Sequence, residues 1–144
     1  MKKILFLVSL FAALTCRADG LPVTALSAGF HRVEAEVAHT FDTRAKGLMH
    51  RKSMAANHGM LFIFPDVARH CMWMRNTLLP LSVAFLDEQG RIINVEEMQP
   101  RTEDNHCATR PARYALEMNA GWFQAKGLLA GAAINGLEKL PPPQ

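Results

Sequence analysis

The pattern of hydrophobic and polar positions divides the chain into short segments, most of them with the period of strands. Residues 30–40 alternate, with Val33, Ala35 and Val37 on one face, as in a half-exposed strand. Residues 59–64 and 81–86 are apolar at nearly every position, which is typical of strands covered on both faces. Weaker alternation predicts strands at 91–98 and 113–118, a short strand is expected at 71–74, and a last one at 133–137.

Two short helices interrupt these strands. Asp42 or Thr43 could cap a helix that runs to Arg51 with Gly47 inside it, and a second helical turn holds Trp122 and Phe123 and ends at Gly127. Residues 88–90 predict a hairpin turn. The expected fold class is therefore α+β and mainly β: a single compact domain with a strongly curved sheet or small barrel and two short helices.

The two ends of the chain differ from this central part. Lys2 and Lys3 precede an apolar run of about a dozen residues, the layout of a signal peptide, and we expect it to be residues 1–18. Residues 19–29 are interpreted as a linker or a loosely attached first strand, and 30–138 as the globular domain. The proline-rich residues 139–144 are expected to form a disordered tail.

Cleavage of the signal peptide changes the charge balance. Loss of Lys2, Lys3 and Arg17 lowers the 16 basic residues to 13, which equals the 13 acidic residues. A basic surface for nucleic acid is therefore not expected, and the apolar run is too short for a membrane span of about 20 residues. We expect a periplasmic or secreted protein with no nucleic-acid partner and no stable membrane anchor.

The cysteines fit an exported protein. Cys16 leaves with the signal peptide, and Cys71 and Cys107 remain as an even pair, for which a disulfide is expected in an oxidising compartment. Closing this loop should stabilise the fold by roughly 4 kcal/mol.

Three segments together carry a family resemblance. Residues 44–49 (RAKGLM), 59–64 (GMLFIF) and 73–81 (WMRNTLLPL), followed by Gly90-Arg91-Ile92 and Ala115-Leu116-Glu117, resemble the successive signatures of the domain of unknown function 192 family. The resemblance covers about residues 30 to 131. It implies a compact, mainly-β domain that is often exported, with no agreed activity.

Three positions depart from the family pattern. Arg75 stands where Lys is common, Ser82 where Asp is frequent, and Gly131-Ala132 where a Gly-Asp pair is usual. The change from Lys to Arg keeps a cation but replaces a point charge with a planar fork.

A polar set between two predicted central strands is the first candidate binding site. A cation, an amide and a hydroxyl on three consecutive residues could bind a carboxylate or another small anion beside an aromatic ring. The candidate residues are Arg44, Trp73, Arg75, Asn76, Thr77 and Asp104. Alternatively, Asn76 and Thr77 form a turn whose side chains bond the backbone, and Arg75 pairs with Asp104 or Glu117 on the surface.

Metal binding is a second candidate function. The repeated His-Cys dipeptides at 70–71 and 106–107 offer two Cys and two His for zinc, but neighbouring strand residues point to opposite faces and a disulfide would remove the thiolates. Copper is an alternative because Cu(I) prefers soft sulfur ligands. Its candidate ligands are His70, Met72, Met74 and His106, and further sulfur atoms come from Cys71 and from the upstream Met49, Met54 and Met60. Methionine is nevertheless more often a core residue.

Catalysis is the third class. No G-x-S-x-G, H-E-x-x-H or phosphate-binding glycine motif occurs, and His106 near Asp104 is a weak acid/base pair. The sequence therefore favours a non-catalytic module without a cofactor that binds a small ligand or a protein partner. A copper or other metal-binding accessory protein and an enzyme of unknown class are the alternatives.

Overall fold

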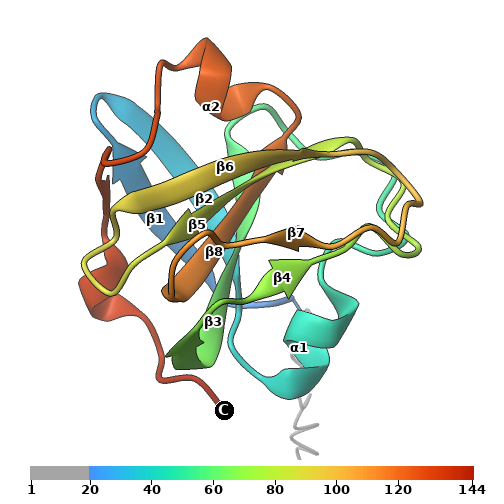
Figure 1. The fold of residues 1–144 in the computed structure, drawn as a ribbon, viewed down its shortest axis with the longest axis horizontal. Helices are drawn as coiled ribbons and strands as arrows, with labels where there is room; N and C mark the ends of the chain where they lie inside the picture. The colour runs from blue at the N-terminus through green and yellow to red at the C-terminus, as the bar shows by residue number, and fades with distance from the viewer. Residues whose placement is uncertain (1–19) are drawn as a thin grey trace, which may run out of the picture.

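The computed structural model describes residues 20–144, and a seven-stranded sheet forms its centre (Figure 1). The strand order is β6-β5-β8-β3-β2-β1-β9, and all neighbours are antiparallel except β2 and β3. The strands are β1 (Val23–Ala28), β2 (His31–Ala38), β3 (His58–Ala68), β5 (Leu81–Leu86), β6 (Ile92–Met98), β8 (Ala112–Asn119) and β9 (Ile134–Asn135). The mainly-β single domain expected from the sequence is confirmed.

The sheet curls so strongly that its two edges meet at one end. Arg91, just before β6, forms an antiparallel bridge with Ala133, just before β9. The Ile92 amide donates to the Ala132 carbonyl at 2.9 Å, and the Ile134 amide donates to the Gly90 carbonyl at 2.8 Å. These bonds join the edge strands β6 and β9 at this end of the sheet. The sheet therefore forms a half-barrel.

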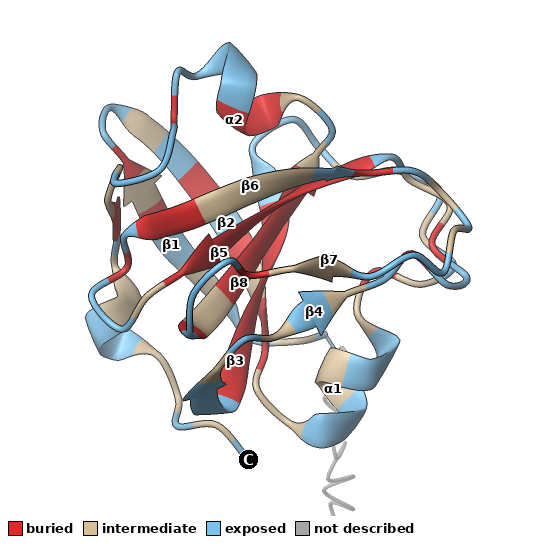
Figure 2. Cartoon of the chain, viewed as in Figure 1, coloured by how far each residue is buried: buried red, intermediate tan, exposed pale blue. Residues whose placement is uncertain are grey.

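Both faces of the central strands are covered, as the continuous apolar runs predict (Figure 2). Leu61, Ala84 and Leu116 belong to a cluster on one face that includes Trp122 and Phe123. Met60, Val83 and Ala115 belong to a second cluster on the other face, which includes Leu48 and Met74. Burial of both faces explains why β3 and β5 lack the alternation of a half-exposed strand.

A two-stranded ribbon lies in front of the sheet in Figure 1, below β5 and β8 in the view. It pairs β4 (Cys71–Met72) with β7 (His106–Cys107), and a disulfide joins Cys71 to Cys107. The expected strand at 71–74 is therefore shorter, because the chain turns after Met72. Met74 lies fully buried in the core of the second face.

The first helix, α1 (Phe41–Lys46), connects the parallel strands β2 and β3. Its cap is Thr40, whose Oγ1 accepts from the Thr43 amide at 3.2 Å while the Thr40 amide donates to Thr43 Oγ1 at 3.0 Å. The cap expected at Asp42 or Thr43 was therefore placed too late. Gly47, expected within the helix, ends it with a φ of +48°, and the following residues form turns.

The remaining elements are short. Helix α2 (Trp122–Ala125) lies near one end of the sheet, and a 3₁₀ turn, η1 (Leu137–Lys139), follows β9. Segment 19–29, interpreted as a linker or a loose first strand, contains β1, which pairs with both β2 and β9. In the segment expected as a disordered tail, the Gln144 amide donates to the His39 carbonyl at 2.7 Å.

The expected signal peptide lies outside the described residues. Within residues 20–144, no helix has the length and apolar character needed to span a membrane.

Removing the disulfide should destabilise the fold without changing its topology. The bond closes a loop with a sequence separation of 36, and loss of this constraint on the unfolded chain should lower the free energy of unfolding of Cys71→Ser/Cys107→Ser by about 4 kcal/mol. Urea unfolding measures this difference. The reduced wild-type protein should match the double variant, and equal stability of oxidised and reduced protein would contradict the prediction.

Candidate functional site

One carboxyl group lies among the apolar side chains of the second face. Glu117 is in the middle of β8, the strand between β3 and β5, and its register partners are Met60 and Val83. Only 4% of the residue is exposed. Its neighbours on this face are therefore the hydrophobic residues of two adjacent strands.

No described residue donates a hydrogen bond to this carboxyl group, and no ion pair reaches it. The other buried polar side chains, Thr77 and Ser82, both form hydrogen bonds. Burial raises the pKa of Glu117 to about 8, because removal from water disfavours the charged form. At neutral pH the group is therefore mostly protonated.

Glu117 is not sealed in the core, because it lines a small open pocket between α1 and the segment that follows β4. We call this the Glu117 pocket. It has a volume of about 30 Å³, on a scale where one water molecule needs about 10–15 Å³. Its eleven lining residues are Arg44, Ala45, Lys46, Gly47, Leu48, Met49, Phe62, Met72, Trp73, Thr77 and Glu117.

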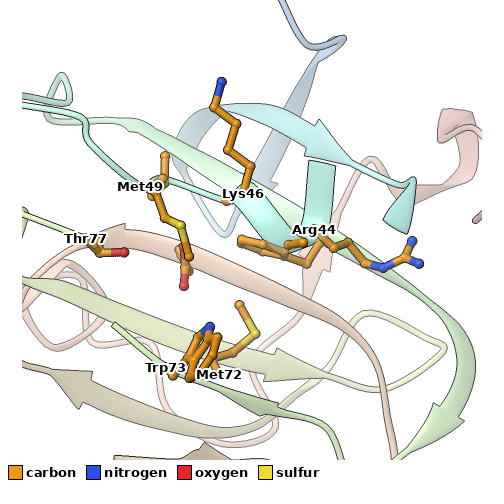
Figure 3. A pocket seen from close by; sticks show the side chains of 11 residues that line it. Arg44, Lys46, Met49, Met72, Trp73 and Thr77 are labelled. Atoms are coloured by element: carbon orange, nitrogen blue, oxygen red, sulfur yellow. The ribbon is translucent and has the colours of Figure 1, made fainter. Parts of the chain in front are cut away.

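Figure 3 shows how the labelled side chains surround this pocket. Met49 points into it from the segment after α1, and Met72 and Trp73 approach from the opposite side. The Lys46 ammonium extends away from it. The pocket therefore combines thioether and aromatic walls with a carboxyl group.

Three residues of the sequence-predicted binding site line this pocket: Arg44, Trp73 and Thr77. The Arg44 guanidinium points away (Figure 3) and donates to the carbonyls of His39 at 2.7 Å, Ile63 at 3.2 Å and Gln144 at 2.9 Å. Arg44 therefore contributes its stem to the pocket, while its charged end joins α1, β3 and the C-terminal segment.

The other three predicted residues lie elsewhere. Arg75 and Asn76 line a neighbouring hollow, and Arg75 lies 5.2 Å from the Trp73 ring centroid and 3.1 Å from a Glu103 carboxylate oxygen. Asn76 forms a turn with a φ of +54°. Asp104 is exposed and lines neither hollow. The alternative surface pairing of Arg75 with Asp104 or Glu117 is wrong, because Glu103 takes that position and Glu117 is buried.

The four alternative metal ligands also separate into different surroundings. The His70 ring stacks on Phe64 at 3.8 Å, and His106 Nδ1 lies 3.9 Å from a Glu96 oxygen. Met74 is fully buried, whereas Met72 lines the Glu117 pocket. Among residues 20–144, no three His, Cys, Asp or Glu side chains gather in a way that could hold a metal ion.

Sequence reasoning missed Glu117 as a site residue. Alternation in residues 113–118 placed Tyr114, Leu116 and Met118 inward, which left Glu117 on a face expected to be exposed. The structure covers that face with α1 and the segment after β4. A signal was present, since the Ala115-Leu116-Glu117 triplet belongs to the family resemblance.

Ser82 illustrates how the chain accommodates a departure from the family pattern. This fully buried serine donates to the Glu97 carboxylate at 2.7 Å and accepts from the Gly121 amide at 2.8 Å. Glu97 also accepts from the Gly121 amide at 3.2 Å. An acidic group is therefore still near position 82, supplied by β6, and it helps to hold the start of α2.

Comparison with family models decides the relationship of this chain. The model of DUF192, described as "Uncharacterized ACR", matches residues 23–136. The chain belongs to the DUF192 family. The match contains the whole sheet and the Glu117 pocket, and the family description assigns no activity.

Two solved structures are similar to this DUF192 protein. A protein from Sinorhizobium meliloti 1021, provisionally named a transcription regulator, has 36% sequence identity and a TM-score of 0.73, covering 79% of this chain and 91% of that one. A protein of unknown function from Novosphingobium aromaticivorans DSM 12444 has 29% identity and a TM-score of 0.78, covering 83% and 89%. No curated protein matches.

The burial of Glu117 should make stability fall as pH rises. An unfolded chain releases this proton near pH 4.5 and the folded protein near pH 8, so between these values only the folded state holds the proton. At about 1.4 kcal/mol per pKa unit, raising the pH from 4.5 to 8 should lower the contribution of Glu117 to the free energy of unfolding by about 5 kcal/mol. Glu117→Gln removes this contribution, so its free energy of unfolding should fall less between pH 5 and pH 9.

Urea unfolding at the two pH values measures the effect, and the exposed Glu138→Gln is the matched control. The other ionisable groups are shared by all three proteins, so their contributions cancel in the comparison. A Glu117→Gln profile parallel to the wild type would show that Glu117 does not carry the pH dependence.

Proposed function

We propose that this protein is an exported binding module that holds a small cation in the Glu117 pocket. The observation that carries the proposal is a carboxyl group that is 4% exposed, lines an open pocket and accepts no hydrogen bond from residues 20–144. Because the carboxyl group lines an open pocket, a partner from outside the chain can reach it. A cation is the partner that a carboxylate binds most strongly in apolar surroundings.

The walls of the pocket support a cationic ligand. Trp73 and Phe62 are aromatic residues, whose ring faces attract cations. The thioethers of Met49 and Met72 are polarisable and carry no competing positive charge. The two basic residues that line the pocket, Arg44 and Lys46, direct their charged ends away from it (Figure 3).

The size of the pocket limits the ligand. A volume of about 30 Å³ holds roughly two water molecules. A metal ion or a methylammonium group fits this space, whereas a nucleotide or a sugar does not. The proposed ligand is therefore a small cation, in place of the small anion expected from the sequence.

Export is supported by the cysteines and by the first residues. Disulfides persist in oxidising compartments, and the Cys71–Cys107 bond would be unusual in a reducing cytosol. Residues 1–18 have the layout of a signal peptide. The balanced charge after cleavage does not favour nucleic acid, so the provisional name of the Sinorhizobium relative is not extended to this protein.

Titration with a panel of small cations tests this proposal. Isothermal calorimetry of residues 19–144 with the nitrates of potassium, methylammonium and silver(I), in chloride-free buffer, should give saturable one-to-one binding for at least one cation. Glu117→Gln keeps the shape of the side chain but cannot lose a proton and become negatively charged when a cation binds, and we expect it to weaken that binding by about 10-fold or more. Glu138→Gln should bind as the wild type does. The proposal fails if no cation binds, or if Glu117→Gln binds as tightly as the wild type.

A further inference from the structure

Most methionines in the described part of the chain serve as core residues. Met60, Met74, Met98 and Met118 are at most 1% exposed. Their side chains fill the two clusters on either side of the sheet. They are therefore not available to an incoming ligand.

Met49 and Met72 differ from these four in position. Both are partly exposed, and both line the Glu117 pocket although they come from segments on opposite sides of it (Figure 3). Met54 is also partly exposed and, like Met72, packs against the second core cluster, but it does not line the pocket. Two methionine side chains and a buried carboxyl group therefore line the same pocket.

Sulfur ligands select a particular class of metal ion. Thioethers bind soft monovalent ions such as Cu(I) and Ag(I), whereas Mg²⁺, Ca²⁺ and Mn²⁺ prefer sets of oxygen ligands. With Cys71 and Cys107 tied in a disulfide, methionine is the sulfur ligand that remains available in an oxidising compartment. A single carboxylate would balance the charge of a monovalent ion.

We propose that the Glu117 pocket is a binding site for a soft monovalent metal ion, Cu(I) or Ag(I), with Met49, Met72 and Glu117 as its ligands. Trp73 and Phe62 line the same pocket and would lie beside the ion. This inference rests on the proposed function, because it names the cation that the pocket selects. It uses none of the histidines considered from the sequence.

Silver(I) provides a direct test because it is soft and monovalent and does not change oxidation state in aerated buffer. We expect the wild-type protein, with its disulfide intact, to bind one Ag(I) more tightly than potassium or methylammonium in nitrate buffer. Met49→Leu/Met72→Leu keeps apolar side chains of similar volume but removes both sulfurs, and it should weaken Ag(I) binding by roughly 100-fold. Met54→Leu is the matched control and should bind as the wild type does. Circular dichroism of each variant establishes that it is folded.

The physiological ion is then tested with Cu(I). Anaerobic competition against a chromophoric Cu(I) chelator should give one bound ion in the wild type and in Met54→Leu, and a large loss in Met49→Leu/Met72→Leu. Because Trp73 lines the pocket, a bound ion should quench its fluorescence. Trp73→Phe should remove most of this quenching.

The outcomes separate this inference from the proposed function. If Ag(I) binds as tightly to Met49→Leu/Met72→Leu as to the wild type, the ion is held elsewhere and the inference is overturned. If methylammonium or potassium binds in a Glu117-dependent way and Ag(I) does not, the inference fails while the proposed function stands. If no cation depends on Glu117, both fail.

Discussion

Coverage of both faces of the central strands is the constraint on which the rest of this structure depends. β3, β5 and β8 lie side by side in a sheet whose two faces carry separate hydrophobic clusters. The α1 segment and the disulfide-linked ribbon cover one of these faces. A polar residue in the middle of β8 on that face is then buried, and Glu117 is such a residue. The pocket exists because this cover is incomplete at the place where α1 meets the segment after β4.

The disulfide and the site are connected through the same cover. Cys71 immediately precedes Met72 and Trp73, so the bond to Cys107 fixes the start of the segment that forms one wall of the pocket. Thr77 closes the turn that follows by donating to the Arg75 carbonyl at 3.2 Å. On the other wall, the Arg44 guanidinium holds α1 against β3 through the Ile63 carbonyl. Residues that the sequence indicated as ligands thus help to position the walls of the pocket.

Local pattern was sufficient to predict most of the fold. The apolar runs at 59–64 and 81–86 identified the central strands because burial on both faces leaves a direct compositional signal. Helix limits were less accurate, since the cap at Thr40 depends on a reciprocal bond with Thr43 that several neighbouring polar residues could have supplied. Burial of Glu117 and the meeting of Met49 with Met72 depend on segments distant in sequence. Alternation within one strand carries no information about such contacts.

Within residues 20–144, Glu117 is a buried carboxyl group that accepts no hydrogen bond, and it must lose its proton to bind a cation. An NMR titration of the side-chain carboxyl carbon of Glu117, in metal-free buffer, tests this most directly. Burial predicts a midpoint near pH 8, and the same titration with a bound cation should shift the midpoint downward. A midpoint near the ordinary glutamate value of about 4.3 would mean that the carboxyl group is solvated or already paired, and would contradict the account.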